Sequence, residues 1–249
     1  NTTGAINNLM EQLYENFNSS AITQGVFLDF SKAFDTINHQ ILIDKLPFYG
    51  LTFRATRVLE SYLQNRKQFV MVNGHVSDMR KISVGVPQGS ILGPLLFLIN
   101  INDLLKAAPI LSYILYADDT NIFSTDPKIL QNEIINIENC CIANKLVLNY
   151  SKTFQVIFKA PNKRFNSLDY IVNLSNTTLE LKNETKFLGI TLDSTITFKQ
   201  HLVLLCQKLN LILFMMKAVR PYFDQKTMIE LLSWLSCIMP SFIHIYYME

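Results

Sequence analysis

The sequence predicts an α+β fold, an antiparallel sheet with helices packed against it. Two hairpin signals carry this prediction, because each joins strands that run antiparallel. Helical and strand patterns are also interleaved along all 249 residues, and 49% of the residues are apolar, enough to bury a sizeable core. The hairpins argue against a doubly wound parallel sheet.

Helices and one buried strand account for the N-terminal quarter. Apolar residues at helical spacing predict a helix over residues 5–18. A short apolar run predicts a buried strand over 25–30 that ends on an acid, Asp29. A second helix is expected to end at Pro47, and a third spans 53–64.

The middle of the chain contains the two hairpins. Asn73-Gly74 is the preferred kind of two-residue hairpin turn. The second hairpin has Ala117-Asp118-Asp119 at its tip, so that acids lie at the end of two apolar strands. The predicted strand pairs are 67–72 with 76–82, and 111–116 with 120–124.

The remaining elements are helices and short strands. Residues 91–106 are densely apolar and predict a helix. Asp126-Pro127, a cap followed by a first-turn proline, predicts a helix over 127–146. From residue 197 the pattern predicts two helices joined near Pro221. Short strands are predicted at 154–159, 170–174, 178–181 and 186–192.

The net charge of +2 is unevenly distributed. Residues 54–81 and 145–164 are basic stretches in a near-neutral chain. Such stretches favour a phosphate backbone, and hence a nucleic acid, as a partner. Ordinary solvated faces explain the same pattern, and charge alone does not decide between the two.

Membrane and zinc-binding classes are disfavoured. No uninterrupted apolar run reaches the roughly 18 residues of a spanning helix, since Lys208 interrupts the run over 202–216. The N-terminus lacks the pattern of a signal peptide, and we expect no membrane partner. The cysteines form no C-x-x-C pair, which indicates reduced thiols in an intracellular protein, either nuclear or cytoplasmic.

Acidic residues follow or join apolar strands at two places, Asp29 and Asp118-Asp119. Ionised carboxylates next to a core are costly unless a cation compensates them. Neighbouring strands of one sheet would bring Asp29 and Asp118 to the same edge, forming a hard oxygen site for magnesium or manganese rather than zinc. Two such ions suit phosphoryl transfer. The alternative is that Asp118-Asp119 only forms a turn, where Asp is common.

Five ordered blocks of the sequence resemble the motifs of reverse transcriptases. A lone YADD is a weak signal, whereas five blocks in the family's order are specific. The connecting segments are most similar to non-LTR retrotransposons of the jockey type. The blocks are VFLDFSKAFDTINH (26–39, motif A), GVPQGSILGPLLF (85–97, motif B), YADD (116–119, motif C), LNYSKT (148–153, motif D) and FLGI (187–190, primer-grip hairpin).

The resemblance implies a right-hand polymerase palm with partial fingers and a partial helical thumb. Palm and fingers would occupy residues 1–193, with the fingers over about 37–83, and the thumb would begin in 194–249. The implied activity is that of an RNA-directed DNA polymerase. It would add deoxynucleoside triphosphates to a DNA primer on an RNA template, using two Mg²⁺ ions, with Mn²⁺ as the alternative.

The resemblance also assigns catalytic residues. Asp29 and Asp118 match the two metal-bridging aspartates, and Asp119 matches the third acid of the site. Lys152 matches the motif D lysine that protonates the leaving pyrophosphate. A mobile ammonium near phosphate suits general acid work, although a solvated lysine would look the same in the sequence.

Three further residues match nucleotide-binding positions. Phe34 matches the aromatic that closes the sugar pocket against a 2′-hydroxyl, because a rigid ring leaves no room for an added oxygen. Gln88 and Gly89 match the loop that touches the incoming nucleotide and the template. The alternatives are a core aromatic for Phe34 and a plain turn before a helix for Gln88 and Gly89.

At both ends the chain differs from the family pattern. The basic fingertip strands and an endonuclease region are expected to be missing, so that the chain itself would have little or no polymerase activity. One alternative is therefore a catalytically inactive retroelement remnant that binds nucleic acid weakly. The other is a reverse transcriptase of the group II intron or telomerase type.

Overall fold

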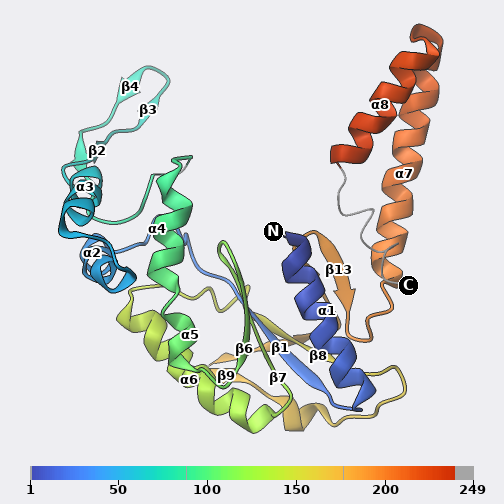
Figure 1. Ribbon diagram of the computed structural model, residues 1–249, viewed down its shortest axis with the longest axis horizontal. Helices are drawn as coiled ribbons and strands as arrows, with labels where there is room; N and C mark the ends of the chain where they lie inside the picture. Colours follow the sequence, from blue (N-terminus) through green and yellow to red (C-terminus); the bar gives the residue numbers. More distant parts are fainter. Residues whose placement is uncertain (1, 88, 176, 239–249) are drawn as a thin grey trace. The chain divides into compact units, whose positions relative to one another are not determined.

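The structure is a computed structural model that describes residues 2–87, 89–175 and 177–238 (Figure 1). The chain divides into two compact units. The larger unit comprises Thr23–Gln155 and Arg164–Leu181. The smaller unit comprises the described residues of Asn1–Ile22, Val156–Lys163 and Lys182–Glu249.

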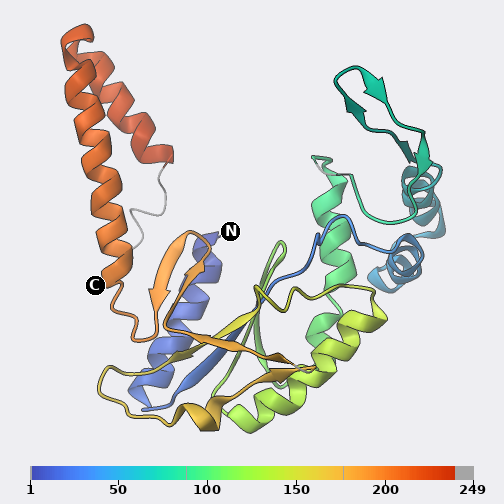
Figure 2. The same ribbon diagram turned by 180° about the vertical axis from the view of Figure 1, so that it is seen from behind.

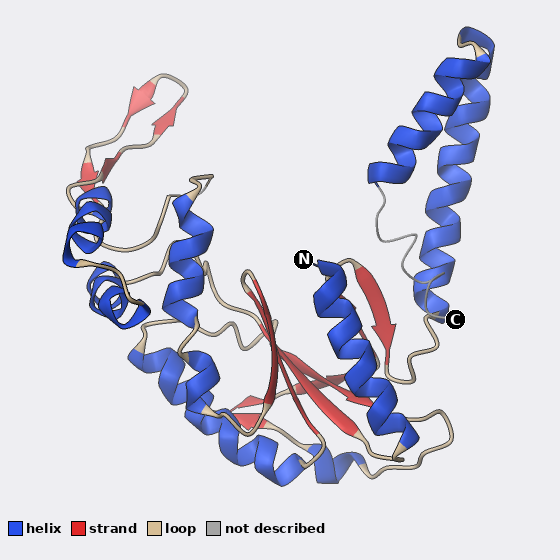
Figure 3. Ribbon diagram, in the orientation of Figure 1, coloured by secondary structure: helices blue, strands red, loops and turns tan. Residues whose placement is uncertain are grey.

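The larger unit contains helices, a central sheet and separate short ribbons (Figure 3). Its helices are α2 (His39–Lys45), α3 (Phe53–Leu63), α4 (Leu92–Ile101), α5 (Leu104–Ala107) and α6 (Pro127–Ala143), with 3-10 turns η1 (Leu46–Tyr49) and η2 (Ser167–Tyr170). Its strands are β1 (Thr23–Leu28), β2 (Lys67–Gln68), β3 (Met71–Val72), β4 (His75–Val76), β5 (Arg80–Lys81), β6 (Ser112–Tyr116), β7 (Asp119–Ser124), β9 (Asn173–Leu174) and β10 (Thr177–Thr178).

The central sheet has five strands in the order β11-β8-β1-β7-β6. The boundary between the units runs through β8 (Phe154–Phe158) and β11 (Glu180–Lys182). β1 pairs antiparallel with β7, from Gln24 opposite Ser124 to Leu28 opposite Thr120. β6 and β7 form the second predicted hairpin. The predicted α+β class is thereby confirmed.

The core of the larger unit lies on one face of β1 and β7. Side chains alternate between the faces of a strand, so Val26 and Ile122 share a face and are both fully buried. Apolar side chains of α4, α5 and α6 join them in one cluster. Phe27 points to the opposite face and stacks on Phe154, with ring centroids 5.3 Å apart.

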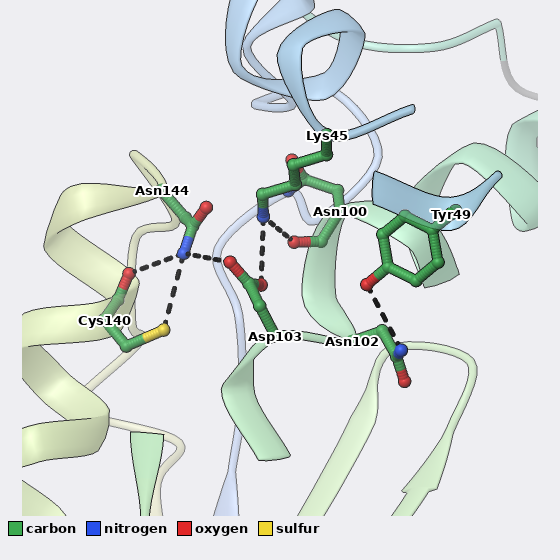
Figure 4. A network of polar contacts seen from close by, with 7 residues as sticks. All are labelled: Lys45, Tyr49, Asn100, Asn102, Asp103, Cys140 and Asn144. Atoms are coloured by element: carbon green, nitrogen blue, oxygen red, sulfur yellow. Dashed lines mark hydrogen bonds and ion pairs between the residues drawn. The ribbon is translucent and has the colours of Figure 1, made fainter. Parts of the chain in front are cut away.

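A polar network ties α2 to the helices of the core (Figure 4). The Lys45 ammonium donates to the Asp103 carboxylate at 2.9 Å and to the Asn100 carbonyl. The other Asp103 oxygen accepts from the Asn144 amide at 3.3 Å. The single helix predicted over 91–106 is two helices, α4 and α5. Asp103 lies between them, and its carboxylate binds Lys45 of α2 and Asn144 at the end of α6.

The smaller unit consists of helices and one hairpin. Its elements are α1 (Thr2–Asn18), β12 (Glu184–Phe187), β13 (Ile190–Asp193), α7 (Lys199–Val219), η3 (Arg220–Tyr222) and α8 (Gln225–Ile238). The chain reverses between α7 and α8, as Figures 1 and 2 show. The single strand predicted over 186–192 is wrong, because Leu188 and Gly189 turn the chain with φ of 46° and 96°. The hairpin that the family resemblance predicts at 187–190 is confirmed.

The helix Lys199–Tyr222 is long and apolar enough to cross a membrane, by length and composition alone. Among the described residues it is the one helix with this property, and its most apolar stretch is not buried in the structure. Length and composition are weak evidence for a membrane span, since core helices of soluble proteins share them. The predicted absence of a membrane partner stays a prediction.

Asp193 holds the loop that leads from β13 into α7. Its carboxylate accepts hydrogen bonds from Thr195, Thr197 and the Phe198 amide, at 2.7 to 3.1 Å. The loop needs this support because Ile196 and Phe198 are non-glycine residues with φ of 51° and 54°. Burial raises the pKa of the Asp193 carboxyl, but the bonds from Thr195 and Thr197 outweigh it and lower the pKa overall.

We expect Asp193→Asn to lower the free energy of unfolding by about 2 kcal/mol at neutral pH, since charge-assisted hydrogen bonds are lost. A depressed carboxyl pKa stabilises the folded state fully above the unfolded value of roughly 4, and this contribution is lost as the pH falls through the folded value. Urea unfolding at a series of pH values should show the difference between wild type and variant shrinking in acid. Exposed Asp78→Asn is the control, and equal stabilities of the Asp193 variant and wild type at pH 7 would contradict the assignment.

Candidate active site

Asp29 is the first residue after β1, and backbone hydrogen bonds fix its position. Its carbonyl accepts from the Asn149 amide at 2.8 Å, and its own amide donates to the Thr153 hydroxyl at 3.2 Å. The next residue, Phe30, forms a bridge to Leu148. The first part of motif A thus lies beside motif D.

Asp118 lies in the two-residue turn between β6 and β7. Tyr116 pairs with Asp119, which leaves Ala117 and Asp118 as the turn. Ala117 has a φ of 52°, a conformation that non-glycine residues rarely adopt and that is often found at functional sites. The turn leaves Asp118 exposed at the tip of the hairpin.

A cavity of about 510 Å³ brings most of the predicted site residues together. The antiparallel β1–β7 register explains this, because Leu28 opposite Thr120 sets Asp29 beside the β6–β7 turn. The bridge between Phe30 and Leu148 brings Asn149 and Lys152 of motif D to the same cavity. Residues lining the cavity include Asp29, Lys32, Phe34, Asp118, Asn149 and Lys152.

Asp119 belongs to the same group of charges although it does not line the cavity. Burial raises the pKa of its carboxyl, and the charges of Asp118 and Asp29 raise it further. Three carboxylates therefore repel one another at this edge of the sheet, and a bound cation would relieve that repulsion.

The donor set fits a divalent cation that a substrate helps to hold. Among the described residues, no three His, Cys, Asp or Glu side chains are placed to hold one ion by themselves. Magnesium is commonly bound by one or two carboxylates together with waters and substrate phosphates. Asp29 and Asp118 on one open cavity are consistent with such a site.

Phe34 is half-buried, with its ring against Phe97 of α4 at a centroid distance of 4.9 Å. Its carbonyl accepts from the Val86 amide at 2.8 Å, which joins motif A to the start of motif B. The close approach requires Gly85, because a Cβ there would lie 2.7 Å from the Asp35 carbonyl oxygen and φ is 83°. Phe34 thus both packs against α4 and lines the cavity.

Of the two predicted motif B residues, the structure describes Gly89 alone. Gln88 lies outside the described residues. Gly89 is exposed, has a φ of 78° and does not line the cavity with Asp29 and Asp118. Ser90 bonds the Pro87 carbonyl at 2.8 Å and accepts from the Gly93 amide at 2.9 Å, so a turn here leads into α4.

Lys32 and Asn149 are among the cavity residues that were not predicted as site residues from the sequence. Lys32 lies inside motif A and is held with a φ of 50°. Asn149 lies inside motif D, and its side-chain oxygen accepts from Ser151 at 2.8 Å. Their presence in the quoted motifs was the available signal. Lys32 adds a second ammonium, beside Lys152, to a cavity that contains two carboxylates.

Comparison with known sequences agrees with these motifs. Residues 5–192 match the family described as reverse transcriptase (RNA-dependent DNA polymerase). The chain is 31% identical to the probable RNA-directed DNA polymerase from transposon BS of Drosophila melanogaster, over 81% of this chain and 23% of that protein. It is 30% identical to the RNA-directed DNA polymerase from mobile element jockey of the same species, over 72% of this chain and 20% of that protein. The chain thus spans between a fifth and a quarter of these relatives.

Solved structures of similar fold include telomerases. Telomerase from Candida albicans in complex with a fragment of telomeric RNA has a TM-score of 0.55 at 14% identity, over 78% of this chain and 34% of that chain. Apo telomerase from Candida tropicalis, truncated from the C-terminal domain, has a TM-score of 0.51 at 13% identity, over 76% of this chain and 39% of that chain. At this identity the likeness shows the fold alone, whereas the sequence relatives are polymerases of mobile elements. The chain therefore belongs to the reverse transcriptase (RNA-dependent DNA polymerase) family, with jockey-like relatives.

Proposed function

We propose that this chain provides the catalytic part of an RNA-directed DNA polymerase of a non-LTR retrotransposon. The observation that carries the proposal is the single cavity lined by Asp29 and Asp118 together with Phe34 and Lys152. The Drosophila relatives are named as RNA-directed DNA polymerases, which supports the reaction. The RNA bound to a telomerase of similar fold supports a nucleic-acid template as the partner.

Asp29 and Asp118 would hold divalent ions, Mg²⁺ or Mn²⁺, with Asp119 adding negative charge behind them. Bound there, two such ions would activate the primer 3′-hydroxyl and stabilise the triphosphate and the departing pyrophosphate. Lys152 is exposed on the same cavity and would donate a proton to the pyrophosphate. Phe34 would exclude a 2′-hydroxyl from the sugar position.

The domain assignment is part of the same proposal. Residues 1–193 would form the palm and fingers, with the fingers over about 37–83, and 194–249 would begin a thumb. The described helices α7 and α8 support a helical thumb. The incoming nucleotide would be a deoxynucleoside triphosphate, and the strands would be an RNA template and a DNA primer.

Primer extension on a heteropolymeric RNA template tests the proposal. The protein is expressed from the complete reading frame that encodes these residues. We expect a labelled DNA primer to be extended with all four deoxynucleotides when Mg²⁺ is present, and extension to stop when a chelator removes the ion. Binding of template and primer without extension would instead favour the catalytically inactive remnant.

Lys32 is expected to contact the triphosphate. A left-handed lysine is costly, and this one places an ammonium on the cavity beside the metal-binding acids. We expect Lys32→Gly to raise the KM for deoxynucleotides about tenfold or more, because a charge-assisted phosphate contact contributes roughly 1.5–3 kcal/mol. Glycine tolerates the same backbone conformation, so the change removes the charge without adding strain.

Lys145→Gly is the matched control for this measurement. Lys145 is also exposed and also left-handed, with a φ of 56°, but it does not line the cavity. Steady-state kinetics should show an unchanged KM for the Lys145 variant. Equal KM values for both variants would remove Lys32 from the nucleotide site.

A further inference from the structure

The hairpin over residues 66–82, named here the basic ribbon, carries a charge arrangement that is costly to its own fold. Lys67 lies directly opposite Lys81 in the β2–β5 pair, next to Arg80 opposite Gln68. Like charges facing each other across an antiparallel pair destabilise it. Among the described residues, neither these three cations nor Arg66 has a carboxylate partner. An anionic ligand bound beside the two lysines would attract both ammonium groups and so compensate their mutual repulsion.

The basic ribbon is also apolar and exposed. Figures 1 and 3 show β3 and β4 projecting beyond α3, with no other described element of that unit beside them. An isolated two-stranded hairpin is marginally stable in water. Its exposed large apolar side chains are Phe69, Val70, Met71, Val72, Val76 and Met79, each more than half exposed.

The backbone of the basic ribbon is specified despite this exposure. Asn73 and Gly74 have φ of 50° and 81° at its tip, the two left-handed residues of a tight hairpin turn. Two residues on one strand oppose three on the other between the Gln68–Arg80 and Met71–Val76 pairs, which makes a bulge. Arg66 lies over the Tyr62 ring of α3, 5.5 Å from its centroid. The turn, the bulge and the Arg66 contact therefore give the basic ribbon one defined backbone conformation.

We propose that the basic ribbon binds single-stranded RNA, as a template-contacting element that rests on the proposed polymerase function. Lys67 and Lys81 share one face of the ribbon and would bind neighbouring phosphates of the RNA, while Arg80 adds positive charge from the other face. Phe69 offers a ring on which an unpaired base can stack, and stacking on aromatic residues is tolerant of sequence. A duplex would not offer its base faces. A protein strand added to the edge would have to bring carboxylates opposite the paired lysines.

Fluorescence anisotropy with a short labelled oligouridylate tests this proposal on the whole chain. The variant Lys67→Gln/Lys81→Gln should raise the Kd about tenfold and lower the slope of log K against log salt by about 1.4, because each phosphate contact on a single strand contributes roughly 0.7. Phe69→Leu keeps an apolar side chain but removes the ring, and should raise the Kd about tenfold with the salt slope unchanged.

The matched control is Lys106→Gln/Lys128→Gln, which removes the same charge from exposed lysines on α5 and α6. Its Kd and salt slope should stay at the wild-type values. Equal losses in both double variants would reduce the effect to net charge and overturn the proposal. Unchanged RNA binding in the ribbon variants would also overturn the proposal. If those variants then lost self-association in sedimentation, the ribbon would be a protein contact instead. Asp118→Asn should keep RNA binding, so that failure of the ribbon and failure of the polymerase function are separately visible.

Discussion

Asp118→Asn is expected to reduce RNA-templated DNA synthesis by about a thousandfold. Asp118 lines the cavity together with Asp29, and the neutral amide would remove one charged ligand from the proposed metal site. A loss of about 4 kcal/mol of transition-state stabilisation is typical for such a change, and each 1.4 kcal/mol is a factor of ten. Primer extension in single turnovers, on protein from the complete reading frame, measures the effect.

The fold should survive this substitution. Asp118 is exposed in a two-residue turn, where asparagine is as well tolerated as aspartate. The change also removes a charge that raises the pKa of Asp119, so repulsion within the acidic cluster decreases. We therefore expect thermal unfolding to match the wild type.

Asp126→Asn is the control for loss of an acid. Asp126 caps α6 by accepting from the Lys128 and Ile129 amides, and asparagine caps helices equally well. Its synthesis rate should be unchanged. If the Asp118 variant retained a tenth of the wild-type rate, Asp118 would not be a metal ligand.

Local signals explain why much of the fold was predictable. Asn73-Gly74 forms the expected tight turn, and Asp126-Pro127 begins α6 as expected. In both places the conformation is set by the residues themselves, through left-handed φ at the turn and a side-chain cap at the helix start. Tertiary contacts do not have to intervene.

The elements that were mispredicted are set by distant partners or by unusual backbone. The 91–106 helix is interrupted where Asp103 bonds Lys45 and Asn144, residues far away in the sequence. The strand predicted over 186–192 is broken by a turn through Leu188 in a left-handed conformation, and leucine gives no local signal for such a turn. The resemblance alone predicted the hairpin at 187–190.

The candidate site shows the same division. Asp29 and Asp118 could be placed at one sheet edge because they end or join apolar strands, and the structure brings both to one cavity. Lys32 lies within motif A, but its place on the cavity depends on a left-handed backbone conformation for which lysine gives no local signal. The roles of all these residues stay predictions.

Phe34→Val is expected to weaken discrimination against ribonucleotides by roughly 10- to 100-fold, the range over which a steric pocket separates substrates that differ by one small group. The Phe34 ring lines the cavity and is held against Phe97, so valine would leave room where a 2′-hydroxyl would lie. Deoxynucleotide insertion should change less, because the smaller sugar already fits. Single-nucleotide insertion assays give the ratio of kcat/KM for the two sugars.

Two further variants separate the sugar pocket from core packing. Phe34→Tyr keeps the ring and should keep the discrimination of the wild type. Phe97→Leu removes the supporting ring from a residue that is fully buried and does not line the cavity. It should lower the free energy of unfolding by about 1–3 kcal/mol with a smaller change in sugar choice than Phe34→Val. If Phe34→Val lost stability but kept the wild-type ratio of sugars, Phe34 would be a core aromatic, and the 2′-hydroxyl would have to be excluded by another wall of the cavity.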